Sequence, residues 1–535
     1  PALQGVLSAK GSLVWQDGLL SALDGHFQWQ HPGFTGRKAT GVQGQLRWQG
    51  FTHSGQLEIS PISGISAQPL SARLRLHWKG RLQGDFSAKR LPVQLVMDIA
   101  GPLLPAHWQN WRQSSWHGNL RDLQVHFAKI RNSQKLGWQL QTRLDDLDIP
   151  ALGQAPGLDG LSGHLDFQPQ QFSLHLQSRQ LKVFWPRYFA HSWFLQKVSG
   201  HISGRWNAQH WSLQAAPLLV HGPGDLQLTA SIGPQQLHLQ ARLQHLPARD
   251  INTFLPNQGI SPALQRWLSR AFLSGTLDKA DLRWRGPWQH LPQNHNHDHL
   301  NLQAHFHNVH LHYAARWPDA EHLDARLLWT GNTLTVRSHG DISGIPVREA
   351  QVSIGNLDTA LASPLYAEIN TPLAMAKLLP CLRQTPILRH AQTPPLQLSG
   401  EGQLHLALKV PFHHEKTQVQ GVLALQKAGV KMGNWRAESI SGPIHFQRDA
   451  INAKNLQGQF VGGPAQVSLQ AKALDQQTHL QMQLQGSLQA GQLPLPQSWQ
   501  SRLHGVIPYQ VSGTLENGRL RLLGSARLQR SRSSL

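Results

Sequence analysis

Residues 226–243 have the sequence LQLTASIGPQQLHLQARL, and this stretch decides the fold class. Its apolar residues fall at every second position on both sides of Gly233-Pro234: Leu226, Leu228, Ala230 and Ile232, then Leu237, Leu239, Ala241 and Leu243. Gln, Thr, Ser, His and Arg occupy the positions between them. A period of two places alternate side chains on opposite faces of a strand. The stretch therefore predicts an antiparallel strand pair with one apolar and one polar face.

The same alternation recurs along the chain and predicts a mostly β protein. It is found at Leu404, Leu406, Leu408 and Val410, at Leu480, Met482 and Leu484, and at Phe306, Val309, Leu311 and Tyr313. The last series changes phase at Asn308. A slip of one residue would turn the apolar side chains to the wrong face, so we predict a β-bulge at Asn308.

Two short motifs repeat within this pattern. An aliphatic-Ser-Gly triplet ends at Gly64, Gly163, Gly200, Gly275, Gly344, Gly400, Gly442 and Gly513. A Leu-x-Trp-x-Gly element is centred on Trp48, Trp78, Trp284 and Trp329. The copies are irregularly spaced, which argues against β-helix coils or propeller blades and favours repeated hairpins along one long sheet. Short helices are predicted only near 261–273 and 372–382.

Composition limits the classes of protein to which the chain can belong. The 535 residues are 40% hydrophobic, enough for a substantial apolar interior, and the formal charge is +20. The one cysteine, Cys381, excludes an internal disulfide framework and is expected to be a packed thiol. No stretch has the roughly 18 apolar residues of a membrane helix. The chain starts at Pro1, and we expect it to be a piece of a longer protein.

The search for catalytic and cofactor motifs predicts that the protein is not an enzyme and holds no cofactor. Phosphate-binding loops, dinucleotide fingerprints, zinc-protease helices and serine-hydrolase elbows are all missing from the sequence. The best metal candidate is His295, His297, His299 and His305 with Asp298, but the 32 histidines are scattered along the chain, and we predict no metal site. Basic residues are dispersed without interleaved aromatics, so no nucleic acid is expected as a partner.

The one-sided strands leave two structures open. Their apolar faces could pack against each other in ordinary β-sandwiches. Alternatively, one sheet could curl along its length so that its apolar face lines a groove for lipid chains. Exposing an acyl chain to water costs about 0.8 kcal/mol per CH₂, so moving a lipid through water requires an apolar track.

Several stretches resemble the YhdP branch of the AsmA-like family of bacterial envelope proteins. The most specific is the block Leu264-x-x-Trp267-Leu268-x-x-Ala271-Phe272-x-x-Gly275-x-Leu277, which leads into Leu282-x-Trp284-x-Gly286. Val309-x-Leu311-x-Tyr313, Trp317-Pro318 and Leu323-x-Ala325-x-Leu327 follow in the same order. The APGLDGLSG stretch at 155–163 is similar as well. The resemblance covers roughly residues 100–530 and is faint before residue 100. The family's N-terminal membrane helix and its C-terminal portion are expected to be missing from this chain.

The resemblance implies a long, curled antiparallel sheet that forms an elongated, apolar-lined groove. Residues 1–100 would be an N-terminal β segment of the groove, and residues 101–535 its repetitive body. The parent protein would be periplasmic, anchored in the inner membrane of a Gram-negative bacterium, and would move phospholipid to the outer membrane. Its partners would be phospholipid acyl chains and, through the missing termini, both membranes.

The predicted groove-lining side chains are the members of the alternating series: Leu226, Leu228, Ala230, Ile232, Leu237, Leu239, Ala241, Leu243, Phe306, Val309, Leu311, Tyr313, Leu404, Leu406, Leu408, Val410, Leu480, Met482 and Leu484. Two alternative functions stay open. One is an envelope-assembly factor that receives outer-membrane strands by edge pairing. The other is a β-rich surface adhesin with filled sandwiches. Because carboxylates are few, we also predict that the fold survives to about pH 3.

Overall fold

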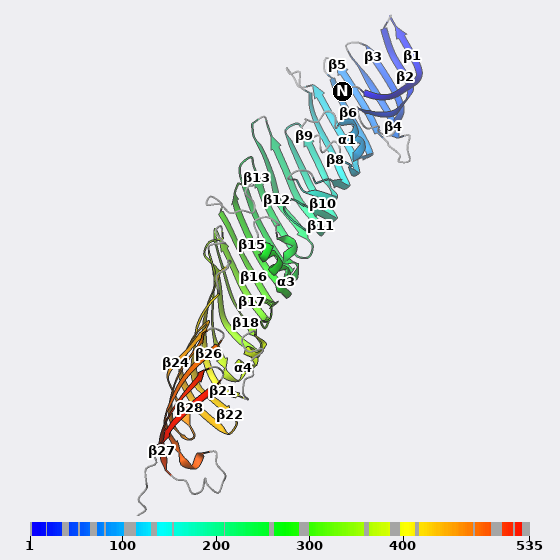
Figure 1. Cartoon of the computed structure of the whole chain (residues 1–535). Coiled ribbons are helices and arrows are strands. Elements are labelled where there is room, and N and C mark those ends of the chain that lie inside the picture. Colours follow the sequence, from blue (N-terminus) through cyan, green and yellow to red (C-terminus); the bar gives the residue numbers. More distant parts are fainter. Residues whose placement is uncertain are drawn as a thin grey trace, which may run out of the picture.

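A single antiparallel sheet of 28 strands makes up almost the whole of the computed structural model (Figure 1). Each strand pairs with the strands that precede and follow it in the sequence, so the sheet is one continuous meander. The structure describes residues 3–17, 19–34, 42–51, 54–64, 72–79, 82–100, 114–129, 136–151, 155–207, 209–255, 262–287, 299–357, 363–385, 396–411, 417–474, 477–493, 505–516 and 519–526.

The strands of the first half are β1 (Leu3–Gln16), β2 (Leu19–Phe34), β3 (Val42–Phe51), β4 (Ser54–Gly64), β5 (Ala72–Lys79), β6 (Leu82–Pro92), β7 (His117–Lys129), β8 (Leu136–Ile149), β9 (Gly157–Gln168), β10 (Gln171–Phe184), β11 (Trp193–Trp206), β12 (Trp211–His221), β13 (Asp225–Ile232) and β14 (Leu237–Pro247). Those of the second half are β15 (Phe272–Gly286), β16 (His299–Leu311), β17 (Ala320–Thr330), β18 (Thr333–Ile342), β19 (Ile345–Ile354), β20 (Leu365–Ala374), β21 (Leu396–Val410), β22 (Gln418–Met432), β23 (Trp435–Gln447), β24 (Ala450–Phe460), β25 (Gly463–Leu474), β26 (Gln477–Gln489), β27 (Val506–Glu516) and β28 (Arg519–Ala526).

The helical segments lie along one long edge of the sheet (Figure 1). They are α1 (Val93–Ala100), η3 (Ala248–Phe254), α3 (Pro262–Ala271), α4 (Met375–Gln384) and η5 (Ala490–Gln492). Every one of them follows an even-numbered strand, and in an antiparallel meander all even-numbered strands end at the same edge. We call this the helical edge. The opposite edge, where odd-numbered strands end, is the turn edge.

The two predicted helices are present with shifted bounds. The first is α3, which begins at Pro262 and ends at Ala271, and Ser261 lies outside the described residues. The second, α4, begins at Met375 and not at Pro372, because residues 371–374 continue β20 and pair with β21. The hydroxyl of Thr371 is buried there and donates to the carbonyl of Pro346 on β19.

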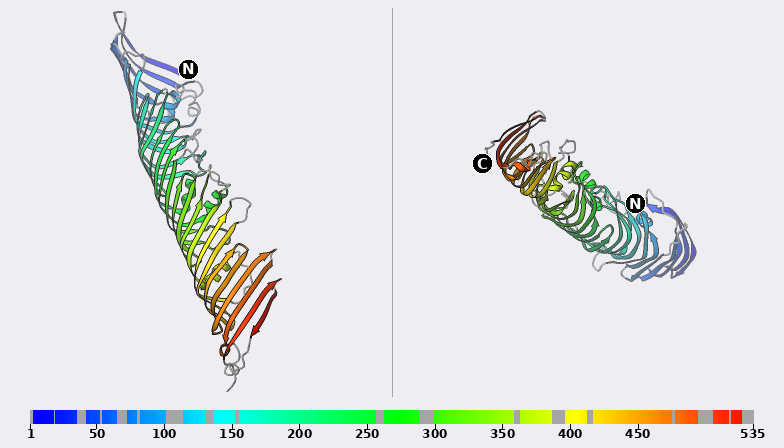
Figure 2. Two further views of the ribbon diagram at one scale, coloured as in Figure 1. Left: turned by 90° about the vertical axis from the view of Figure 1, so that its left-hand side faces the viewer. Right: turned by 90° about the horizontal axis from the view of Figure 1, so that it is seen from below.

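The sheet is a single layer that curls across its width (Figure 2), and we call the space along its apolar face the groove. Burial is deepest at the helical edge, where Leu246, Val309 and Leu373 are 1% exposed. Away from that edge the same face is only half-buried, as on β13, where apolar half-buried positions alternate with exposed polar ones. A second sheet packed on this face, as in a β-sandwich, would have buried these side chains fully. Since β1 and β28 are not paired with each other, the sheet is not closed, and the predicted fold class is confirmed.

A row of β-bulges near the helical edge bends the strands. The bulge predicted at Asn308 is confirmed by its φ of +48° and by a register shift between Phe306 and Val309. Facing it on β15, Gly275 has a φ of +105°, and a Cβ there would lie 2.6 Å from the Cα of Val309. Only glycine fits so close to a bulged neighbour. Four copies of the aliphatic-Ser-Gly repeat, at Gly200, Gly275, Gly400 and Gly442, therefore mark bulges, since all four glycines have positive φ, whereas the copy at Gly344 lies in the turn between β18 and β19.

Candidate functional site

Strand register places the predicted alternating series on one face of the sheet. Residues that lie directly opposite each other on paired strands point to the same face. Leu226 lies opposite Leu243, and Ala230 opposite Leu239, so the two halves of the deciding stretch share a face. Leu239 in turn lies opposite Trp284, and Leu277 on the same strand as Trp284 lies opposite Phe306.

This face continues without interruption to the last strands. From β16 to β21 a line of opposed residues runs through Ala304, Leu327, Val336, Val352, Ala367 and Leu408. From β21 to β26 a second line runs through Leu404, Leu423, Ile444, Ala453, Leu469 and Met482. One-residue slips would break either line, because each slip exchanges the two faces. Contact of these side chains with lipid remains a prediction.

Tyr313 lies apart from the other predicted residues. It follows the end of β16, in the connection to β17, and its carbonyl accepts a hydrogen bond from the indole N–H of Trp267 at 2.9 Å. Burial raises the pKa of its phenol to about 12. The strand β16 and its alternating pattern therefore end at Leu311, and Tyr313 lies beyond them.

The apolar face extends into strands from which the sequence reasoning selected no lining residues. A line of opposed residues joins β5 to β13 through Leu74, Phe86, Val125, Leu140, Phe167, Phe172, Gly204, Leu213 and Ile232. The signal that could have found these side chains is the same period of two, as at Phe172, Leu174 and Leu176. Bulges interrupt it on β7, β8 and β12, which shortens each alternating run.

Aromatic side chains border the groove along the turn edge. Phe167 stacks on Trp138 with ring centroids 5.5 Å apart and contacts Trp206 at 5.6 Å. Phe172 covers Gly204 on the next strand, where a Cβ would come within 2.2 Å of its ring. The Leu-x-Trp-x-Gly motif places Trp284 and Trp329 at the same edge, near the ends of β15 and β17. Tryptophan is the side chain that favours a boundary between apolar and wet surroundings.

Helical segments cover the apolar face at the opposite edge. Ile251 and Phe254 of η3 pack against the cluster that includes Leu246, Leu277 and Ala304. Leu378 and Cys381 of α4 pack similarly on the cluster around Leu423. Burial raises the pKa of the Cys381 thiol, as expected for a packed cysteine. The segments η3 and α4 thus cover part of the apolar face.

The other face of the sheet is polar and carries cross-strand ion pairs. Arg121 contacts Asp145 at 2.6 Å, and Arg242 contacts Asp281 at 2.7 Å. Several carboxylates lie between two histidines, as Asp319 does with His310 and His312 at 3.0 and 2.6 Å. Such exposed pairs contribute little to stability, typically less than about 1 kcal/mol each. The polar face is therefore mainly solvated.

We expect acid to leave the sheet intact until the carboxylates titrate. Burial alone would raise the pKa of Asp319, but hydrogen bonds from His312 and His310 outweigh it and lower that pKa below 3.8. The backbone N–H of Asn308, and then His307, lower the pKa of Asp324. A carboxylate whose pKa is lower in the folded protein stabilises the fold fully at pH values above its ordinary pKa of 3.8. This stabilisation is lost as the pH falls through the pKa of the folded protein. Circular dichroism should stay constant from about pH 7 to 5, with any loss confined to below about pH 4. A loss of the circular dichroism signal between pH 6 and 5 would contradict this expectation. The variant Asp319→Asn lacks one carboxylate of lowered pKa, so its loss of structure below about pH 4 should be smaller.

Two negative observations concern the part of the chain that the structure describes. No group of three or more His, Cys, Asp or Glu side chains in it has the arrangement of a metal site. His295, His297 and Asp298 of the metal candidate lie outside the described residues, and His305 faces solvent on the polar face. No helix among the described residues is long and apolar enough to span a bilayer.

Comparison with known proteins agrees with the architecture. The family described as "YhdP protein" matches residues 2–535, including the first hundred residues, where the resemblance in the sequence is faint. The chain belongs to the YhdP family. It is 21% identical over 438 residues to the "Intermembrane phospholipid transporter YhdP" of Escherichia coli (strain K12), a match covering 78% of this chain and 33% of that relative. The chain thus spans about a third of the relative. No solved structure matches it.

Proposed function

We propose that this chain is a segment of a periplasmic bridge that carries phospholipid between the inner and outer membranes. The observation that carries the proposal is the apolar face, on which opposed residues follow one another from β5 to β26. Acyl chains would lie against this face while headgroups stay in water along the open side of the groove. Membership of the YhdP family and the printed name of the E. coli relative support phospholipid as the cargo.

The mechanism requires no chemistry from the protein. Each CH₂ kept against the apolar face avoids a cost of about 0.8 kcal/mol, so a chain that slides along a uniform face meets no large barrier. We propose that the side chains named above from β13, β14, β16, β21 and β26 form this track, and that β1–β6 belong to its N-terminal part. The protein would act as a non-enzymatic conduit, in a parent anchored in the inner membrane.

The two alternatives are less favoured. An adhesin of filled sandwiches would cover the apolar face with a second sheet, whereas β13 and β14 form part of a single layer with half-buried apolar side chains. An assembly factor would use free strand edges, but every strand from β2 to β27 has neighbours on both sides.

The first test is whether the protein holds phospholipid. We expect native mass spectrometry of protein purified without detergent to show bound phospholipid, and delipidated protein to take lipid up from vesicles. Photo-crosslinkers at Leu228 and Leu406 should label lipid, whereas crosslinkers at Thr229 and His405, which face water on the same strands, should not. Equal labelling of both faces, or none, would contradict the proposal.

A further inference from the structure

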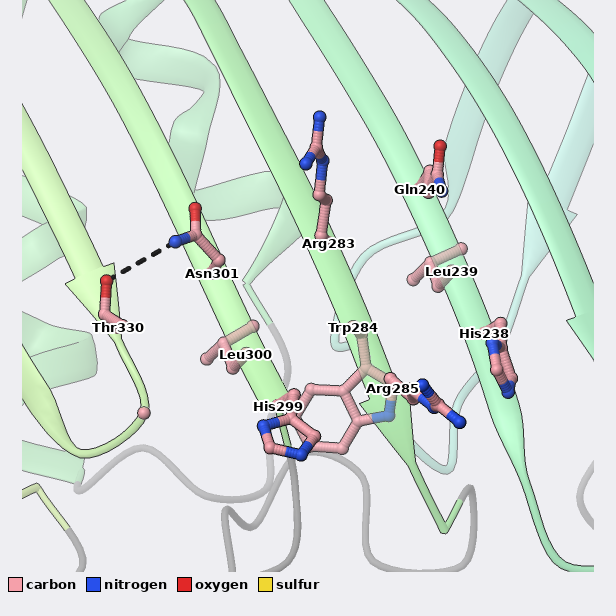
Figure 3. Close-up of a pocket in the computed structure, with 11 residues that line it drawn as sticks. His238, Leu239, Gln240, Arg283, Trp284, Arg285, His299, Leu300, Asn301 and Thr330 are labelled. Atoms are coloured by element: carbon pink, nitrogen blue, oxygen red, sulfur yellow. Dashed lines mark hydrogen bonds between the residues drawn. The ribbon is translucent and has the colours of Figure 1, made fainter.

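Four adjacent strands form a shallow hollow on the polar face, close to the turn edge. Its volume is about 500 Å³. Most of the side chains that line it belong to the polar face: His238 and Gln240 of β14, Arg283 and Arg285 of β15, His299 and Asn301 of β16, and Thr330 of β17 (Figure 3). Arg283 and Arg285 thus lie on the central strand, between a histidine and an amide on each neighbouring strand.

Register brings the basic groups of this hollow into direct opposition. Arg285 lies opposite His238 on one side and opposite His299 on the other. Arg283 lies opposite Gln240 and Asn301. Side chains directly opposite on antiparallel strands are about 5 Å apart at Cβ, so the guanidinium of Arg285 and the two imidazole rings lie close enough to contact one bound anion.

Neither Arg283 nor Arg285 has a carboxylate partner among the described residues, unlike Arg121 and Arg242 on the same face. Arg337 donates to the side-chain oxygen of Gln351 at 3.1 Å. Among the described residues, no carboxylate lines the hollow. The nearest along β15 is Asp281, which is already engaged by Arg242 and by Lys279 at 2.7 and 2.9 Å. Arg283 and Arg285 therefore keep their donors for an external ligand.

The position of the hollow relates it to the groove. Arg285 is the residue before Gly286, where β15 ends at the turn edge, and Trp284 between the arginines points to the apolar face with Leu239 and Leu300. The indole N–H of Trp284 is buried without a partner, whereas the N–H of Trp329, in the same motif, donates to the carbonyl of Gly331 at 2.8 Å. A lipid whose chains rest on Leu239 would meet Arg285 where its glycerol backbone crosses the edge.

We propose that this hollow is a phosphate site that holds the headgroup phosphodiester of a lipid lying in the groove. Guanidinium groups bind phosphate through paired, charge-assisted hydrogen bonds, and the histidines and Asn301 supply further donors. The proposal rests on the proposed function and extends it, because it names the edge along which headgroups travel and the chemical group that is recognised there. A lipid without phosphate would gain nothing from the site.

The test measures the binding of three soluble probes: inorganic phosphate, dihexanoyl-phosphatidylglycerol and dihexanoylglycerol, which lacks phosphate. In the double variant Arg283→Gln/Arg285→Gln we expect at least about tenfold weaker binding of both phosphate-bearing probes, with dihexanoylglycerol unchanged. The control Lys197→Gln/Arg205→Gln removes the same charge from exposed polar-face positions of β11 and should change affinities by less than about twofold.

A groove variant separates the two sources of phosphate. Leu282→Asp, on the apolar face and outside the lining of the hollow, should weaken the binding of phosphatidylglycerol and dihexanoylglycerol but not that of inorganic phosphate. If Leu282→Asp leaves phosphatidylglycerol binding unaffected while the arginine variant weakens it, the site binds phosphate independently of the groove, and the headgroup assignment is wrong. Equal losses in the arginine variant and the charge control would overturn the site itself. Failure of dihexanoylglycerol to bind the unmodified protein would instead contradict the proposed groove.

Discussion

A carboxylate at Leu228 is expected to stop phospholipid supply through this protein while leaving the sheet folded. Leu228 lies in the middle of β13, opposite Leu218 and Ala241 on the apolar face. An acyl chain that passes Leu228→Asp would desolvate a charged group, which costs several kcal/mol. A barrier of about 2.8 kcal/mol already means about a hundredfold slower passage. The backbone hydrogen bonds of β13 do not involve the side chain, so strand pairing should persist.

The matched control is Thr229→Asp, one residue further along the same strand. Thr229 is exposed on the polar face, so the added charge stays in water and transport should be normal. Both variants should be tested in cells in which the unmodified protein supports outer-membrane phospholipid supply, as the proposed function requires. Normal growth and lipid supply with Leu228→Asp, at normal protein level, would mean that chains do not travel past β13.

Sequence periodicity predicted which face of a strand each side chain occupies, but not which residues of paired strands lie opposite each other. The run from Leu226 to Leu243 fixes both its face and its partner, because the Gly233-Pro234 turn joins the two strands directly. For β15 and β16 the alternation is equally clear, yet residues 287–298 separate them, and no local signal says that Arg285 will lie opposite His299. The basic hollow depends on this register, which is why no sequence motif indicates it.

The helical edge was less predictable for a related reason. Residues 248–254 form η3, and their apolar residues Ala248, Ile251 and Phe254 recur at every third position, the period of a 3₁₀-helix. Seven residues are too few for this period to predict a helix, and η3 is stabilised by the burial of Ile251 and Phe254 on the apolar face beside Leu246. Tertiary contact decides the local structure there. Asn308, by contrast, could be predicted, because the apolar residues on both sides of it must reach one face and only a bulge allows that.

Replacing Gly275 with valine is expected to give the largest loss of stability of any single change in β15. Its φ of +105° costs a β-branched residue about 1–3 kcal/mol, and the added Cβ would lie 2.8 Å from the carbonyl oxygen of Asn308 on the paired bulge. The bulge cannot move away without shifting Val309, which is 1% exposed in the core at the helical edge. We therefore expect a total cost above about 3 kcal/mol.

Because each strand contacts mainly its neighbours, the loss should remain local instead of unfolding the whole sheet. Hydrogen exchange should speed up in β15 and β16 and stay unchanged in β5–β8. The control is Gly355→Ala, at a position where no atom lies within 4 Å of an added Cβ, and it should be neutral. Unchanged exchange in Gly275→Val would show that the bulge opposite does not hold the strand. Loss of protection from hydrogen exchange along the entire sheet would show that the meander unfolds as one unit. In that case a change at a single bulge would disrupt the apolar face over its full length.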